Sequence, residues 1–79
     1  MKFEAELTDT FGGEANYSWV RRRTFEAPPD ISDLALVRRA KRELGITGER
    51  TTTETIGSDF QLSFPRRVCM VAFITCDVE

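Results

Sequence analysis

Polar and apolar residues alternate along much of this chain, and that alternation predicts β-strands. A half-buried strand is expected over residues 2–8. A glycine pair then predicts a chain reversal within residues 9–14, because glycine adopts positive φ at little cost. The aromatic and β-branched stretch over residues 16–25 predicts the second strand of a hairpin. The inward positions of the first strand are Phe3, Ala5 and Leu7.

The spacing of apolar residues becomes helical after the prolines at 28 and 29, and it predicts one helix over residues 33–44. Ser32 is the expected N-cap, because its hydroxyl can accept a hydrogen bond from a first-turn N–H. Gly45 is expected directly after the last turn, where left-handed backbone favours glycine. The core-facing stripe of this helix consists of Leu36, Val37, Ala40 and Leu44.

Three further strands are expected after the helix, over residues 50–56, 60–64 and 68–76. The element order is then β-β-α-β-β-β. This order predicts an α+β fold in which a single helix packs on a mostly antiparallel sheet. The length of 79 residues predicts a single small α+β domain over residues 1–79.

The closing strand is apolar on both faces, unlike a strand with one face in water. One face would carry Val68, Met70, Ala72 and Ile74, and the other Cys69, Val71 and Phe73. Because one helix covers only one face of a sheet, the second face needs another cover. Two alternatives are open: a second molecule, either a partner or another copy in a homodimer, or the chain's own Phe11, Tyr17 and Trp19.

Composition argues against an enzyme. The chain has no histidine, which excludes Ser-His-Asp and Cys-His catalysis. Its two cysteines, Cys69 and Cys76, are too few for structural zinc and lie about 23 Å apart on one strand, too far to form a disulfide. We expect both to be buried small residues in a reducing compartment. We expect no catalytic residues, no metal and no cofactor.

The chain has no apolar run of about 18 residues, and its first residues lack the basic and apolar segments of a signal peptide. We therefore expect a protein of the bacterial cytoplasm that has no contact with membranes.

Charge is distributed unevenly. Residues 1–16 carry one basic and four acidic side chains, a net of −3, and residues 17–42 carry seven basic and three acidic side chains, a net of +4. The acidic start predicts a partner-binding site whose carboxylates engage basic residues that normally hold nucleic acid. Aromatic residues dominate interface energetics, so the hairpin aromatics join this site. Its candidate residues are Glu4, Glu6, Asp9, Glu14, Tyr17 and Trp19.

The basic middle of the chain supports an alternative, a nucleic-acid-binding site. Tyr17 and Trp19 are expected to share a strand face with Arg21 and Arg23, and aromatic rings beside guanidinium groups can stack bases and hold phosphates. The helix arginines are expected on the face that points away from the core. The candidate residues of this alternative are Arg21, Arg23, Arg38, Arg39 and Arg42.

The block TDTFGGEANYSWVRR, residues 8–22, resembles a segment of small uncharacterised proteins of phages, prophages and plasmids. Small phage proteins without an enzyme motif resemble anti-CRISPR proteins as a class. That resemblance implies stoichiometric binding to a Cas effector without chemistry, often through acidic surface that replaces nucleic-acid phosphate. The arginine-rich middle departs from the most acidic members of the class. The expected function is a phage inhibitor of a host defence complex, and the alternative is a small nucleic-acid-binding regulator.

Overall fold

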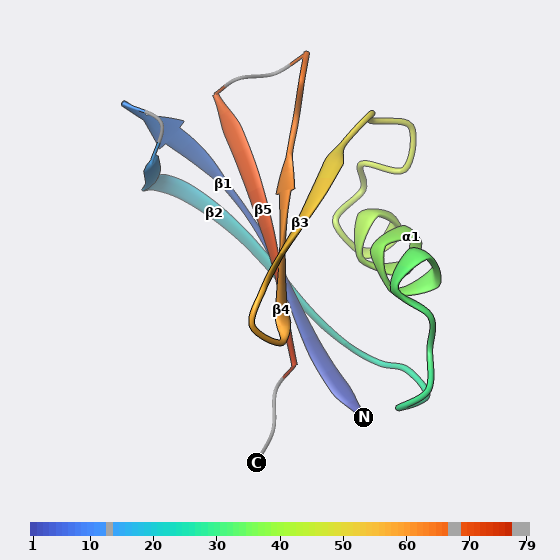
Figure 1. Ribbon diagram of the computed structural model, residues 1–79. Coiled ribbons are helices and arrows are strands. Elements are labelled where there is room, and N and C mark those ends of the chain that lie inside the picture. Colours follow the sequence, from blue (N-terminus) through green and yellow to red (C-terminus); the bar gives the residue numbers. More distant parts are fainter. Residues whose placement is uncertain (13, 67–68, 77–79) are drawn as a thin grey trace.

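The computed structural model describes residues 1–12, 14–66 and 69–76, and these residues form five strands and one helix (Figure 1). The order confirms the predicted α+β fold. The predicted start of the closing strand at Val68 lies outside the described residues. In chain order the elements are β1 (Lys2–Phe11), β2 (Glu14–Glu26), α1 (Asp33–Glu43), β3 (Thr52–Ile56), β4 (Asp59–Ser63) and β5 (Met70–Cys76).

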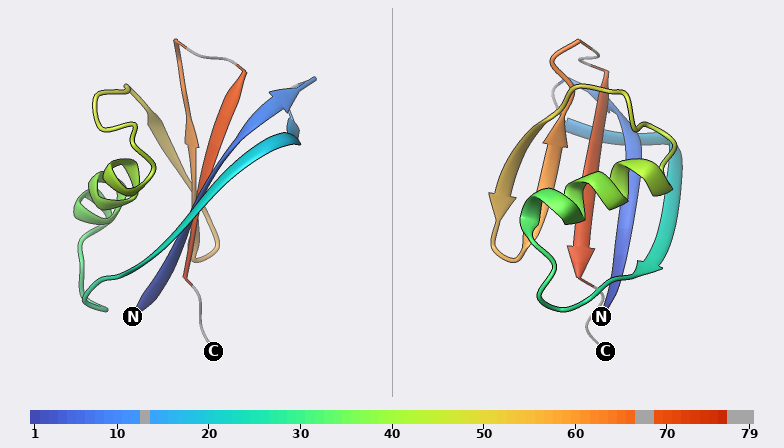
Figure 2. Two further views of the ribbon diagram at one scale, coloured as in Figure 1. Left: turned by 180° about the vertical axis from the view of Figure 1, so that it is seen from behind. Right: turned by 90° about the vertical axis from the view of Figure 1, so that its right-hand side faces the viewer.

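The strands form one sheet in the order β2-β1-β5-β4-β3, and every neighbouring pair is antiparallel. The closing strand β5 thus lies at the centre of the sheet, and β2 and β3 are its edges. The helix α1 lies across one face of this sheet (Figure 2). We call the opposite face, which α1 does not cover, the open face.

The helix begins where the sequence predicts and ends one residue earlier, at Glu43, with Leu44 as its C-cap. The Ser32 hydroxyl accepts a hydrogen bond from the N–H of Ala35 at 3.2 Å. Gly45 follows with φ of +76°, and the N–H groups of Gly45 and Ile46 donate to carbonyls of the last helical turn. The predicted stripe is buried except for Val37, which is half-buried against the core. Capping and packing therefore agree on the position of α1.

The core lies between α1 and the sheet, and the predicted inward residues of β1 are buried in it. The rings of Phe3 and Phe25 stack there with centroids 5.8 Å apart, which joins β1 to the edge strand β2. Leu44 of the helix end packs with Leu62 of β4 and Ile74 of β5, all nearly or fully buried. Each such aliphatic side chain contributes about 1.5–3 kcal/mol relative to exposure.

The hairpin of β1 and β2 contains an irregularity that the alternation of residues does not reveal. Regular pairing stops after Thr8 and resumes at Thr10, so Asp9 alone faces the four residues 16–19 of β2. Surplus residues in one strand break the alternation of its side chains between the two faces. Tyr17, within this stretch, has a positive φ of 56°, which is uncommon for a residue with a side chain.

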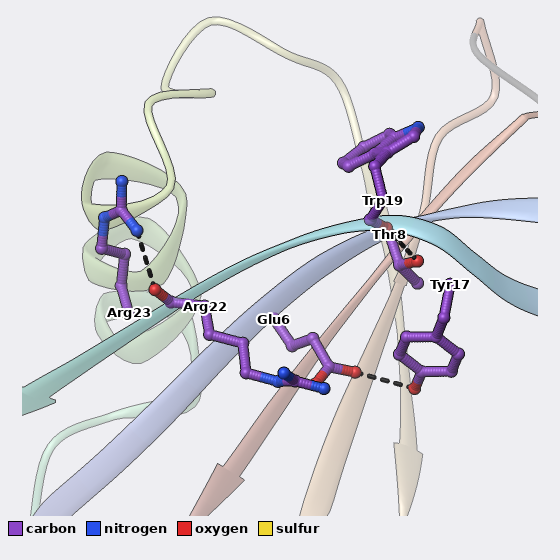
Figure 3. A network of polar contacts seen from close by, with 6 residues as sticks. All are labelled: Glu6, Thr8, Tyr17, Trp19, Arg22 and Arg23. Atoms are coloured by element: carbon purple, nitrogen blue, oxygen red, sulfur yellow. Dashed lines mark hydrogen bonds and ion pairs between the residues drawn. The ribbon is translucent and has the colours of Figure 1, made fainter.

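The two hairpin aromatics consequently point to opposite sides of the sheet. Tyr17 extends over the open face, whereas Trp19 lies on the same side as Arg23 (Figure 3). The expectation that Tyr17 and Trp19 both share a face with Arg21 and Arg23 is therefore wrong for Tyr17. The physical cause is the surplus stretch, which inverts the side-chain direction before regular pairing resumes.

The open face of β5 is covered in part by the chain's own hairpin. Val71 is buried, Phe73 is half-buried, and Tyr17 lines the same hollow as Phe73. Phe11 is 80% exposed and covers nothing, and Trp19 points the other way. Of the three aromatics expected to fold over this face, only Tyr17 does so.

Two further expectations need correction. Cys69 is exposed and Cys76 is half-buried, and both thiols are free, so the expectation of two buried cysteines is wrong. The hairpin strands also reach further than predicted, because β1 continues to Phe11 and β2 begins at Glu14. This extension carries the hairpin beyond the last residue of β1 that pairs with β5, Asp9.

Candidate functional site

A polar network on the open face joins the two strands of the hairpin (Figure 3). The carboxylate of Glu6 accepts hydrogen bonds from the Tyr17 hydroxyl at 2.7 Å and from Nε of Arg22 at 2.7 Å. The Glu6 side chain is only 14% exposed. Its hydrogen bond raises the pKa of Tyr17 and that of Arg22, because the carboxylate favours the protonated form of each partner. Both oxygens of Glu6 are therefore used within the hairpin.

Asp9 holds the surplus stretch of β2 in place. Its carboxylate accepts hydrogen bonds from the hydroxyl and the backbone N–H of Ser18, the latter at 2.9 Å, and from Nδ2 of Asn16 at 3.1 Å. These bonds, the Ser18 hydroxyl foremost, lower the pKa of Asp9 from 3.8 to about 2. Asp9 is thus an anion at neutral pH, and it determines the backbone path on which Tyr17 sits.

Thr8 anchors the other end of the same stretch. It is fully buried, and its hydroxyl donates to the backbone carbonyl of Trp19 at 2.8 Å (Figure 3). Asp9 and Thr8 together fix both ends of residues 16–19, although this stretch makes no regular pairing with β1. The positions of the Tyr17 and Trp19 side chains are therefore set by specific hydrogen bonds.

The far end of the hairpin exposes four large apolar side chains, which we call the hairpin cluster. The ladder between β1 and β5 ends at Asp9, so this end of the hairpin projects from the rest of the sheet, on the side away from α1 (Figures 1 and 2). These side chains lie on both sides of the hairpin, since Tyr17 and Trp19 point to opposite sides of the sheet, and exposed apolar groups concentrated on one projecting element often mark an interface. The exposed fractions are 80% for Phe11, 48% for Tyr17, 43% for Trp19 and 40% for Val20.

The predicted acidic residues are brought together only in part. Glu6 and Asp9 are occupied by bonds within the hairpin, as described above. Glu4 is half-buried on the open face and Glu14 is exposed at the start of β2. Within the described part of the chain, neither the Glu4 carboxylate nor the Glu14 carboxylate takes part in a hydrogen bond or close ion pair. These two carboxylates are the ones available to a partner.

A hollow of about 320 Å³ lies on the open face beside this network. Its volume is at the lower end of the range for small-molecule sites, about 300–1,000 Å³. Its walls combine apolar rings with carboxylates, so it suits an apolar side chain that carries a polar end. The lining residues are Glu6, Tyr17, Ile56, Asp59, Phe60, Phe73 and Thr75.

The alternative, basic set is brought together by the packing of α1 beside β2. Nη1 of Arg21 donates to the carbonyl of Leu44 at 2.7 Å, and the guanidinium of Arg39 lies 5.2 Å from the ring centroid of Phe25. Arg39 also forms an ion pair with Glu43 at 2.9 Å. The expectation that all helix arginines point away from the core is wrong for Arg39, because its stem reaches the rim of the core.

Sequence reasoning missed the residues that shape the hairpin. Arg22 lies directly across from Glu6, and opposite charges at facing positions are a common stabilising pair. The strand register would have revealed this pair. Asn16 and Ser18 act on Asp9 only because of the surplus stretch, and no periodicity in the sequence reports that stretch.

Comparisons with family models, with curated proteins and with solved structures find no match to this chain. No helix among the described residues is long and apolar enough to cross a membrane. The same residues contain no group of three or more histidine, cysteine, aspartate or glutamate side chains placed to hold a metal ion.

Proposed function

We propose that this chain is a non-enzymatic inhibitor, made by a phage or another mobile element, that binds a host defence complex. The proposed partner is a Cas effector, and the proposed mechanism is a steric and electrostatic block of its nucleic-acid-binding surface. The observation that carries the proposal is the hairpin cluster, four large apolar side chains exposed on one projecting hairpin.

The hairpin cluster has the features of an interface anchor. Aromatic side chains bury large areas and contribute much of the energy in protein interfaces. The Tyr17 side chain is held by Glu6 and the Trp19 backbone by Thr8, so binding need not order either of these two groups. Such preorganisation favours affinity, because immobilising a free side chain costs about 0.5–1.5 kcal/mol.

The charge of the hairpin supports an encounter with a basic nucleic-acid channel. The Glu14 carboxylate has no hydrogen-bond or ion-pair partner among the described residues, and the Glu4 carboxylate interacts with Arg22 only at a distance. Asp9 keeps its charge well below neutral pH. Complementary charge increases the association rate and suppresses wrong partners. Glu6 has a structural part in this proposal, since it positions Tyr17 and neutralises Arg22.

Phage plating tests the proposal. In a host whose CRISPR system restricts a targeted phage, expression of the chain is expected to restore plating. Phe11→Ala removes the most exposed ring of the hairpin cluster and is expected to weaken effector binding about thirtyfold, as for a hot-spot residue of about 2 kcal/mol. The matched control is Leu34→Ala, which removes a 62% exposed apolar side chain from α1.

Two results would contradict the proposal. The first is that the expressed and folded chain fails to restore phage plating in every host tested, where the hosts together carry each of the common effector types. The second is an equal loss of protection in Phe11→Ala and Leu34→Ala, since the cluster would then have no special role.

A further inference from the structure

The contact between α1 and β2 gathers arginines from two distant parts of the chain. Arg21 is tied to the end of α1 at Leu44, and Arg39 lies over Phe25. Arg23 lies between Arg21 and Phe25 on the same side of β2, and Arg42 lies between Arg39 and Leu44 along α1. We call this set, completed by Arg38 one turn before Arg42, the basic strip: Arg21, Arg23, Arg38, Arg39 and Arg42.

The guanidinium groups of the basic strip differ in whether they bond to other groups of the chain. Arg21 donates to a carbonyl, and Arg39 is paired with Glu43. Arg23 donates only to the backbone carbonyl of its neighbour Arg22. Arg38 and Arg42 are exposed, and no carboxylate of the described residues pairs with either or with Arg23. Three guanidinium groups therefore keep uncompensated charge.

Trp19 extends the basic strip along β2. It lies two residues before Arg21 and four before Arg23, so these residues follow one another along β2 at intervals of about 6.6 Å. Figure 3 shows the side chains of Trp19 and Arg23 on the same side of the strand. Its ring is 43% exposed, and its backbone is fixed by Thr8. On α1, Ala35 lines a shallow groove of about 210 Å³ together with Arg38, Arg39 and Arg42.

We propose that the basic strip binds single-stranded nucleic acid, with Trp19 stacking on a base and the unpaired arginines holding phosphates. An aromatic platform in line with cations is the arrangement that single-strand-binding surfaces use. A single strand fits better than a duplex, because stacking on Trp19 needs an unstacked base. An acidic protein surface would also satisfy the arginines, and base stacking on Trp19 is the contact that distinguishes a single strand from it.

Fluorescence anisotropy with a labelled oligothymidylate of about 12 nucleotides tests this proposal at several salt concentrations. If three arginines each displace counterions from a single strand, the slope of log K against log salt is about −2. The double variant Arg38→Ala/Arg42→Ala is expected to bring the slope to about −0.7 and to weaken binding at least tenfold at low salt. Alanine is a strong helix former, so this variant keeps α1 folded.

Two controls distinguish binding at the basic strip from non-specific electrostatic attraction to the protein. Arg66→Ala removes one arginine, half the charge that the double variant removes, from an exposed turn outside the strip, and its salt slope is expected to match the wild type. Trp19 is the chain's single tryptophan, so its emission is expected to be quenched on binding. Trp19→Ala is expected to weaken binding about tenfold through lost stacking.

Three results would overturn the proposal: no binding at tens of micromolar protein in low salt, an equal loss in Arg66→Ala and the double variant, or equal competition by polyglutamate. The last result would assign the strip to an acidic protein surface. Because Phe11→Ala leaves the strip intact, a failure here is distinguishable from a failure of the proposed inhibitor function.

Discussion

Thr8→Val tests whether one buried hydroxyl holds the irregular half of the hairpin. The hydroxyl of Thr8 is fully buried and donates to the Trp19 carbonyl at 2.8 Å. Valine has nearly the same shape, so the substitution opens no cavity and removes only the hydrogen bonds of the hydroxyl, to the Trp19 carbonyl and to Oδ1 of Asp9 at 3.3 Å. The lost bond and the unpaired carbonyl cost about 1–3 kcal/mol, and the added methyl offsets up to about 0.8 kcal/mol of it. The net expectation is a loss of about 1–2 kcal/mol.

For a domain of 60–100 residues, 1 kcal/mol corresponds to about 4–8 °C in Tm, so Thr8→Val is expected to lower Tm by about 4–16 °C. Urea unfolding followed by circular dichroism and by Trp19 emission measures the loss of stability. The matched control is Thr24→Val, the same change at an exposed position of β2, which is expected to stay within about 0.5 kcal/mol of the wild type. Equal stability of the two variants would refute the reasoning, because the Trp19 carbonyl would then need no donor from Thr8.

Three further predictions concern the same hairpin and the helix end. The pKa of Asp9 is depressed to about 2, so its charge stabilises the fold above about pH 4 and this contribution is lost as pH falls toward 2. The difference in free energy of unfolding between wild type and Asp9→Asn should therefore be constant near neutral pH and should disappear as the pH falls from 4 to 2. A difference that persists at pH 2 would contradict the depressed pKa of Asp9. Glu6→Gln should lower the pKa of Tyr17, the chain's single tyrosine, in a phenolate absorbance titration, and an unchanged value would exclude the bond seen here. Gly45→Ala should cost about 1 kcal/mol in urea unfolding because Gly45 has φ of +76°, and a neutral effect would argue against the glycine cap.

Local patterns predicted most of the fold. The helix is bounded by Ser32 and Gly45, two signals that act through bonds within a few residues of the chain. The inward positions of β1 followed from strict alternation, which reports burial on one face. The order of strands in the sheet had no local signal, because pairing of β1 with β5 joins residues about 70 apart in the sequence.

The candidate site was harder to predict for a physical reason. Whether Glu6 and Asp9 are free or occupied depends on the register of the hairpin and on the surplus stretch opposite Asp9. That stretch is stabilised by side chain to backbone bonds, which change no hydrophobic period. The contact of Arg21 with the end of α1 likewise depends on tertiary packing. The sequence shows which residues are basic, but it does not show which of them lie near one another.

The most direct measurement of the central claim is hydrogen–deuterium exchange of the chain, free and mixed with a purified Cas effector, the proposed partner. The account predicts that protection on binding is concentrated in residues 10–12 and 14–22, which carry the hairpin cluster. Protection confined to α1 and β3, with the hairpin exchanging as in the free chain, would contradict it.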